Sequence, residues 1–130
     1  MDICKEKETD YFVVAGDIFH KKNPKPKYVS MAAELLNRAA AAFSHVIVIA
    51  GNHDPINTKD KMGPCKILDF LTPDNVIVYE KTSHDIDISD KLALNLRPYI
   101  PLQYTIDPPK KPSKFNIMIA HHHFAGALHG

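Results

Sequence analysis

Residues 46–55 read Val-Ile-Val-Ile-Ala-Gly-Asn-His-Asp-Pro and change abruptly from apolar to polar. The five apolar residues, most of them β-branched, predict a buried strand over Val46–Ala50. After a single glycine come the amide of Asn52, the imidazole of His53 and the carboxylate of Asp54. Three such side chains directly after a buried strand make the end of that strand a candidate functional site.

A similar apolar run, Tyr11–Ala15, ends in Gly16-Asp17. Pro26 suits the first turn of a helix, and apolar residues recur at helical spacing over Tyr28–Ala42. Strand, helix and strand predict a βαβ unit with parallel strands and a right-handed crossover. Continuous apolar runs predict that both strands are covered on both faces. The apolar residues of the helix are Ala32, Leu35, Leu36, Ala39 and Phe43.

The rest of the chain predicts a shorter helix, further strands and a proline-rich loop without regular structure. The two strands that flank Ser89-Asp90-Lys91 should form a hairpin at a sheet edge. The final strand is expected to be buried, and it ends in three histidines. The elements are a helix at Gly63–Leu71, strands at Val76–Tyr79, His84–Ser89, Leu92–Leu96 and Phe115–Ala120, and the loop Pro98–Pro112.

The composition narrows the classes of function. The 130 residues, 45% of them hydrophobic and 24% charged, predict one globular domain, 1–130. A net charge of +1 creates no field that attracts nucleic acid or an anionic membrane, so such binding must come from local patches. No apolar run approaches the roughly 20 residues of a membrane span, so no membrane partner is expected.

Two cysteines, Cys4 and Cys65, lie far apart in the sequence. They fit neither a disulfide framework nor a C-x-x-C metal motif. Without a signal-peptide pattern, they favour a reducing cytoplasm.

Three predicted strands share one feature: each is apolar up to its C-terminal end and then delivers ligand-type residues. The first delivers Asp17 and, three residues later, His20, whereas the second delivers residues 52–54 and the third delivers residues 121–123. Ligands bind outside the carboxyl ends of strands in open α/β sheets, so we expect these side chains to converge. The ligand set of a carboxylate, an amide oxygen and imidazoles suits Mn, Fe or Zn, and it differs from a soft thiolate site.

Each of these residues also has an ordinary structural interpretation. Asp17 and Asn52 follow glycines and suit turns, and His53 suits a hydrogen-bonded surface position. His20 precedes two lysines and suits a solvated loop. Because side chains alternate on a strand, residues 122–123 are favoured as non-ligands. The coincidence of three such strand ends favours the functional interpretation.

Gly16-Asp17 and Gly51-Asn52-His53-Asp54, on successive strand ends, resemble the second and third signature motifs of the calcineurin-like metallophosphoesterases. The histidine that follows Phe115–Ala120 is similar to the family's fourth motif. The resemblance extends from Asp10 to about Gly126. It implies an α/β fold, a partial αββα sandwich with mostly parallel buried strands and an edge hairpin.

Two further segments resemble one branch of that family, the DNA-repair nucleases of SbcD type and their phage counterparts. Gly-Asp-Ile-Phe-His at 16–20 is followed by a segment that contains prolines, as in that branch. Arg97-Pro-Tyr-Ile-Pro101 is similar to the segment before the fourth motif in phage members. The resemblance therefore implies a metal-dependent DNA exonuclease or endonuclease subunit that works in DNA repair and recombination with an SbcC/Rad50-like ATPase.

The resemblance implies a metal role for three residues. Asp17 would bridge two divalent ions, and Asn52 and His121 would bind the second of them. Manganese is the favoured metal, with Fe and Zn as alternatives. Two metals can activate a water and neutralise charge on phosphoryl oxygens, which phosphodiester hydrolysis requires.

The resemblance also implies catalytic roles. His53 would donate a proton to the scissile phosphate or its leaving oxygen, Asp54 would orient His53, and His20 would lie close to the DNA backbone. A histidine beside an aspartate is a plausible general acid near neutral pH. A basic loop beside this site suits a polyanionic substrate, although a solvated charged loop explains it equally well. Its residues are Lys21, Lys22, Lys25 and Lys27.

Two family motifs are missing from this sequence, the D-x-H before the first G-D strand and the G-H-x-H after the last histidine. We therefore expect a truncated phosphoesterase domain that is weakly active or inactive and binds at most one metal, weakly. An exposed apolar sheet edge would favour a homodimer. Two alternatives remain: a phosphomonoesterase or cyclic-nucleotide phosphodiesterase of the same fold, and a non-catalytic module that docks a partner ATPase or DNA.

Overall fold

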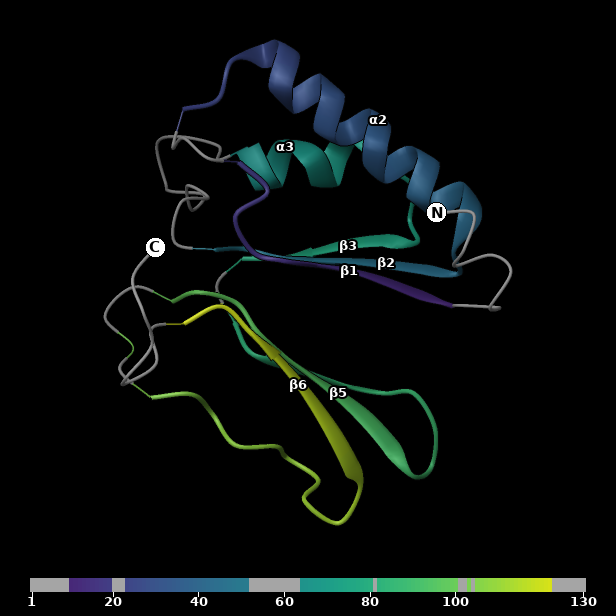
Figure 1. Cartoon of the computed structure of the whole chain (residues 1–130), viewed down its shortest axis with the longest axis vertical. Helices are drawn as coiled ribbons and strands as arrows, with labels where there is room; N and C mark the ends of the chain where they lie inside the picture. Colours follow the sequence, from purple (N-terminus) through teal and green to yellow (C-terminus); the bar gives the residue numbers. More distant parts are fainter. Residues whose placement is uncertain are drawn as a thin grey trace.

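The computed structural model describes residues 10–19, 23–51, 64–80, 82–100, 103 and 105–122. The described elements form three layers: two helices, a parallel sheet beneath them, and a second sheet below the first (Figure 1). The elements are β1 (Tyr11–Ala15), α2 (Pro26–Ala42), β2 (His45–Ile49), α3 (Pro64–Leu71), β3 (Val76–Tyr79), β4 (His84–Asp87), β5 (Leu92–Arg97) and β6 (Phe115–Ala120).

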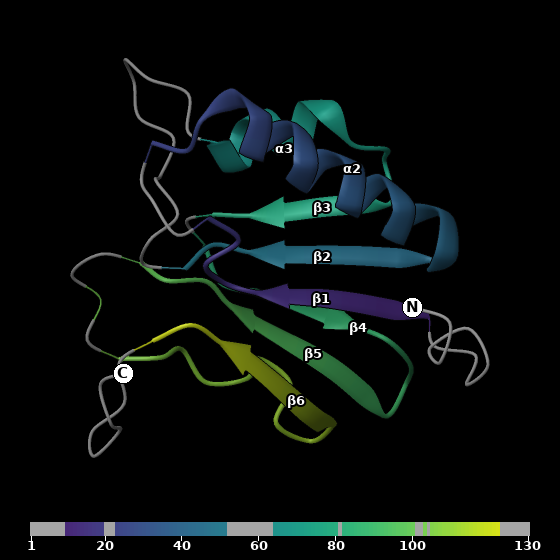
Figure 2. The ribbon, with the colours of Figure 1, turned by 45° about the horizontal axis from the view of Figure 1, so that its top comes forward.

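The first sheet is parallel, with the strand order β1-β2-β3. Val46 of β2 lies opposite Phe12 of β1 on one side and Val76 of β3 on the other. Helices α2 and α3 connect these strands and cover the same face of the sheet (Figure 2). The predicted βαβ unit is confirmed, and Pro26 is the first residue of α2, where its missing N–H costs no helical hydrogen bond.

The second sheet has the order β4-β5-β6. The hairpin of β4 and β5 is confirmed, and the Ser89 hydroxyl accepts hydrogen bonds from the backbone N–H groups of Lys91 and Leu92 in its turn. Strand β6 runs parallel to β5. The predicted mixed α/β fold with mostly parallel strands is therefore confirmed.

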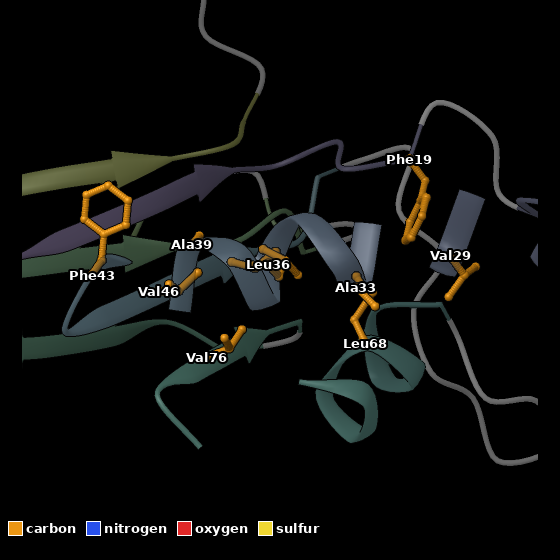
Figure 3. Close-up of a cluster of buried hydrophobic side chains, with 10 residues drawn as sticks. Phe19, Val29, Ala33, Leu36, Ala39, Phe43, Val46, Leu68 and Val76 are labelled. Atoms are coloured by element: carbon orange, nitrogen blue, oxygen red, sulfur yellow. The ribbon is translucent and has the colours of Figure 1, made fainter. Parts of the chain in front are cut away.

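Strand β2 is buried on both faces because its side chains alternate between two cores. Val46 and Val48 pack against the helices, in a cluster that includes Leu36 and Leu68 (Figure 3). On the opposite face of β2, Ile47 and Ile49 pack against Leu94 and Leu96 of β5. A strand between two apolar layers needs a continuous apolar sequence, which explains the run in residues 46–49.

Three predictions about burial are wrong. The final strand β6 is not buried: the exposed fractions of Phe115 and Ile117 are 72% and 42%. Strand β1 is only partly buried. Both are edge strands of their sheets within the described residues, so each has a neighbour on one side only. Leu35 is exposed, because the buried stripe of α2 consists of Val29, Ala33, Leu36 and Ala39.

A buried arginine holds the proline-rich loop against the outer face of the second sheet. The Arg97 side chain is 4% exposed and forms an ion pair of 2.6 Å with Asp85 of β4. Its guanidinium also donates to the backbone carbonyls of Asp107 and Pro108, at 2.9 and 3.1 Å. The described loop residues contain no helix or strand, as predicted, so these contacts replace regular structure.

The pKa of the Asp85 carboxyl reflects two opposing effects. Burial raises it, but the hydrogen bond and positive charge of Arg97, together with the backbone N–H of Lys110, hold the pKa below its ordinary value. A carboxyl whose pKa is lowered by folding adds stability above its unfolded pKa of about 3.9. That contribution disappears as the pH falls through the lower, folded pKa.

We predict that Asp85→Asn lowers the free energy of unfolding by about 3 kcal/mol at pH 7, because it leaves the buried Arg97 charge unpaired. Its stability should also fall less steeply below pH 4 than that of the wild type. Urea denaturation at several pH values measures both effects. The matched control is Asp87→Asn, which removes ion pairs with Lys111 and Lys114 from an exposed carboxylate and should cost much less, because solvent screens an exposed ion pair. Equal losses in the two variants would contradict the prediction.

Candidate metal centre

The chain turns sharply where β1 ends. Gly16 has a φ of +92° and Asp17 has a φ of +50°, so two successive residues are left-handed. Glycine adopts this region freely, and aspartate is among the few other residues that tolerate it. This turn carries the Asp17 side chain to the end of β2, where it packs on Gly51.

Both glycines are required by close packing. A Cβ atom added to Gly16 would lie 2.7 Å from Cγ of His121, and one added to Gly51 would lie 2.8 Å from Cγ of Asp17. Each glycine therefore provides the space for a candidate ligand side chain on the other side of the site. This explains why Gly precedes the polar residue at the ends of both β1 and β2.

Asp17 and His121 meet although they come from different sheets. Nε2 of His121 lies 3.5 Å from Oδ2 of Asp17, and the two side chains are 24% and 31% exposed. Nδ1 of His121 lies 3.2 Å from the carbonyl oxygen of Ala15. A carbonyl can only accept, so Nδ1 is the donor in this hydrogen bond, and in the neutral ring the lone pair lies on Nε2, which faces Asp17.

This pair has the geometry of two ligands of one ion. Metal-ligating histidines commonly donate their second ring N–H to a carbonyl, as His121 does to Ala15. Two ligands that are each about 2.0–2.2 Å from an ion are about 2.8–3.1 Å apart at octahedral angles and about 3.3–3.6 Å apart at tetrahedral angles. The observed 3.5 Å lies in the tetrahedral range. Within the described ranges no group of three His, Cys, Asp or Glu side chains could hold a metal.

The other predicted site residues lie outside the described residues. These are Asn52, His53, Asp54 and His20, together with Lys21, Lys22 and His123. Their roles stay predictions, as do the roles of Asp17 and His121 as ligands. Gly51 is described and buried beside Asp17, so the first residue of the G-N-H-D motif lies at this site.

His122 is directed away from the pair. Its Nε2 lies 3.0 Å from the carbonyl oxygen of Gln103 in the proline-rich loop. That His122 is not a ligand stays a prediction.

Sequence reasoning missed one neighbour of His121. The ring of Tyr99 lies edge-on to the imidazole, with 6.4 Å between centroids and 89° between planes. The only signal in the sequence was the segment Arg97-Pro-Tyr-Ile-Pro101, which contains this tyrosine.

Residues 1–127 match the model of the calcineurin-like phosphoesterase family. The chain belongs to this family. One similar protein is the DNA double-strand break repair protein Mre11 of Methanopyrus kandleri, which is 29% identical over 71 residues. That alignment covers 55% of this chain and 16% of the relative, so the chain spans a small part of the relative's length.

Membership of the calcineurin-like phosphoesterases implies the use of divalent metal, with which the pair of Asp17 and His121 is compatible. None of the described helices is long and apolar enough to cross a membrane.

We predict that Gly16→Ala displaces the His121 ring and lowers the free energy of unfolding by at least about 1–2 kcal/mol, the cost of a left-handed alanine. Gly16→Asn separates the two causes, because asparagine tolerates the left-handed backbone but adds the same Cβ atom. Both variants should shift the ring resonances of His121 in ¹H–¹³C spectra. If Gly16→Asn leaves these resonances at their wild-type positions, the packing of Gly16 against His121 is wrong.

Proposed function

We propose that this chain provides part of a metal-dependent phosphodiesterase centre of SbcD type that cleaves DNA. The observation that carries the proposal is the approach of His121 Nε2 to Asp17 Oδ2 at 3.5 Å, across two sheets. It brings together a carboxylate and an imidazole from two of the signature motifs. Membership of the calcineurin-like phosphoesterase family supports the hydrolytic chemistry.

In this proposal Asp17, Asn52 and His121 hold a divalent ion, with manganese favoured over Fe or Zn. In a complete centre Asp17 would also help to hold a second ion. The divalent ions supply charge neutralisation at the phosphoryl oxygens and activation of the attacking water. The two glycines let the ligands approach directly, and the Ala15 carbonyl accepts from Nδ1 of His121, so that Nε2 faces Asp17.

We assign proton transfer to the residues that follow β2. His53 donates a proton to the leaving oxygen, and Asp54 orients its ring and stabilises its charged form. His20 approaches the backbone of the nucleic acid near the metals. These assignments rest on the resemblance of the motifs and on the position of Gly51 beside Asp17.

The choice of DNA over a small phosphoester rests on charge and on the relative. Lys25 and Lys27 are exposed at the start of α2, on the side of the molecule where β1 and β2 end (Figure 1). Cations at this position can contact phosphates that extend beyond the scissile bond. The similar protein from Methanopyrus kandleri is named for the repair of DNA double-strand breaks.

The same assignment implies partners and a location. We propose that the protein acts with an SbcC/Rad50-like ATPase, forms a homodimer and works in the cytoplasm. The absence of a cysteine framework in the sequence supports a reducing compartment.

The test is cleavage of linear duplex DNA in manganese by the full-length protein that carries these residues. Asp17→Ala should lower the rate at least about 100-fold, because the metal contributes several kcal/mol to transition-state stabilisation. The matched control is Asp69→Ala, and this variant should cleave at the wild-type rate. Asp69 is an exposed carboxylate that forms a surface ion pair with Lys66.

Two results would contradict the proposal. If the protein hydrolysed nitrophenyl phosphate esters but left duplex DNA uncut, the centre would be assigned to small phosphoesters. DNA binding that survives the double change Asp17→Ala and His53→Ala, in a protein without any hydrolytic activity, would indicate a non-catalytic binding module.

A further inference from the structure

The segment Arg97-Pro98-Tyr99 joins the two sheets at the end where the candidate ligands lie. The backbone N–H of Tyr99 donates to the carbonyl of Ala50, the residue after β2, at 2.8 Å. The carbonyl of Arg97 accepts from the N–H of His121 at 3.0 Å. This segment is therefore hydrogen-bonded to Ala50, which follows the strand that leads into the G-N-H-D motif. It is also hydrogen-bonded to His121, which faces Asp17.

This segment is anchored by buried contacts. Ala50 is 3% exposed and Arg97 is 4% exposed. The guanidinium of Arg97 is fixed by Asp85 on β4 and by two carbonyls of the proline-rich loop. Because the backbone of this segment is fixed to both sheets, the side chain of Tyr99 is held in a defined place.

The ring of Tyr99 restricts the imidazole of His121. Their edge-on arrangement, with centroids 6.4 Å apart, is within the range of favourable aromatic pairs. Rotation of the imidazole out of its plane would break both this contact and the hydrogen bond from Nδ1 to Ala15, whereas a half-turn in the same plane would break the hydrogen bond alone. The Tyr99 contact thus fixes the plane of the ring, and the hydrogen bond to Ala15 selects the orientation in which Nε2 faces Asp17.

We propose that Tyr99 is a positioning residue of the candidate metal centre, which holds the plane of the His121 imidazole so that Nδ1 meets the carbonyl of Ala15. Its backbone N–H also joins the segment after β5 to Ala50 at the end of β2. The statement about metal rests on the proposed function, whereas the statement about the imidazole does not.

The first test measures the tautomer of His121 without metal, by two-bond ¹H–¹⁵N spectra recorded above the pH at which the ring shifts stop changing. In the wild type and in Tyr99→Phe, which keeps the ring, the proton should reside on Nδ1. In Tyr99→Leu the ring should rotate, and both tautomers should appear. The matched control is Phe70→Leu, an exposed aromatic on α3, which should resemble the wild type. Urea denaturation establishes that each variant is folded.

The second test measures manganese affinity by calorimetry in the same four proteins. Loss of an outer contact to a metal-ligating histidine typically costs 10–100-fold in affinity, so Tyr99→Leu should bind at least about 10-fold more weakly than Tyr99→Phe. A folded Tyr99→Leu protein with the wild-type tautomer and affinity would overturn the inference. A wild-type protein that has the Nδ1–H tautomer but binds no manganese would instead overturn the proposed metal centre.

Discussion

The burial of β2 on both faces is the constraint on which the rest of the structure depends. Val46 and Val48 belong to the core beneath the helices, and Ile47 and Ile49 belong to the core between the sheets. One strand thus fixes the position of three layers relative to one another. Because the strand cannot shift by one residue without exchanging its two faces, Gly51 after it lies at a fixed place. That place is beside Asp17.

Much of this arrangement could be predicted from local patterns, because the helices and strands follow apolar periodicity and proline position. The βαβ unit, the hairpin and the start of α2 at Pro26 are of this kind. The exposure of Phe115 and Leu35 could not be predicted in this way. The burial of Phe115 depends on what pairs with the far edge of its strand. The burial of Leu35 depends on which of two adjacent stripes of the helix meets the sheet.

The candidate site could likewise be predicted only in part from local sequence patterns. Glycine followed by a polar residue at a strand end indicates a site, and the structure brings Asp17 and His121 together. The strands β1 and β6 lie in different sheets, however, so the separation of these side chains depends on sheet packing rather than on the spacing of residues along the chain. The contact of Tyr99 with His121 has the same origin, since its backbone crosses from one sheet to the other.

The central claim is that Asp17 and His121 face one divalent ion, and paramagnetic broadening tests it most directly, because it detects even weak binding. Traces of Mn²⁺ added to the labelled chain should first broaden the resonances of Asp17, His121 and Gly51, and Asp17→Asn should abolish this effect. The histidines of β2 and β4, His45 and His84, provide internal references. Broadening of these two histidines with sharp resonances at His121 would contradict the account.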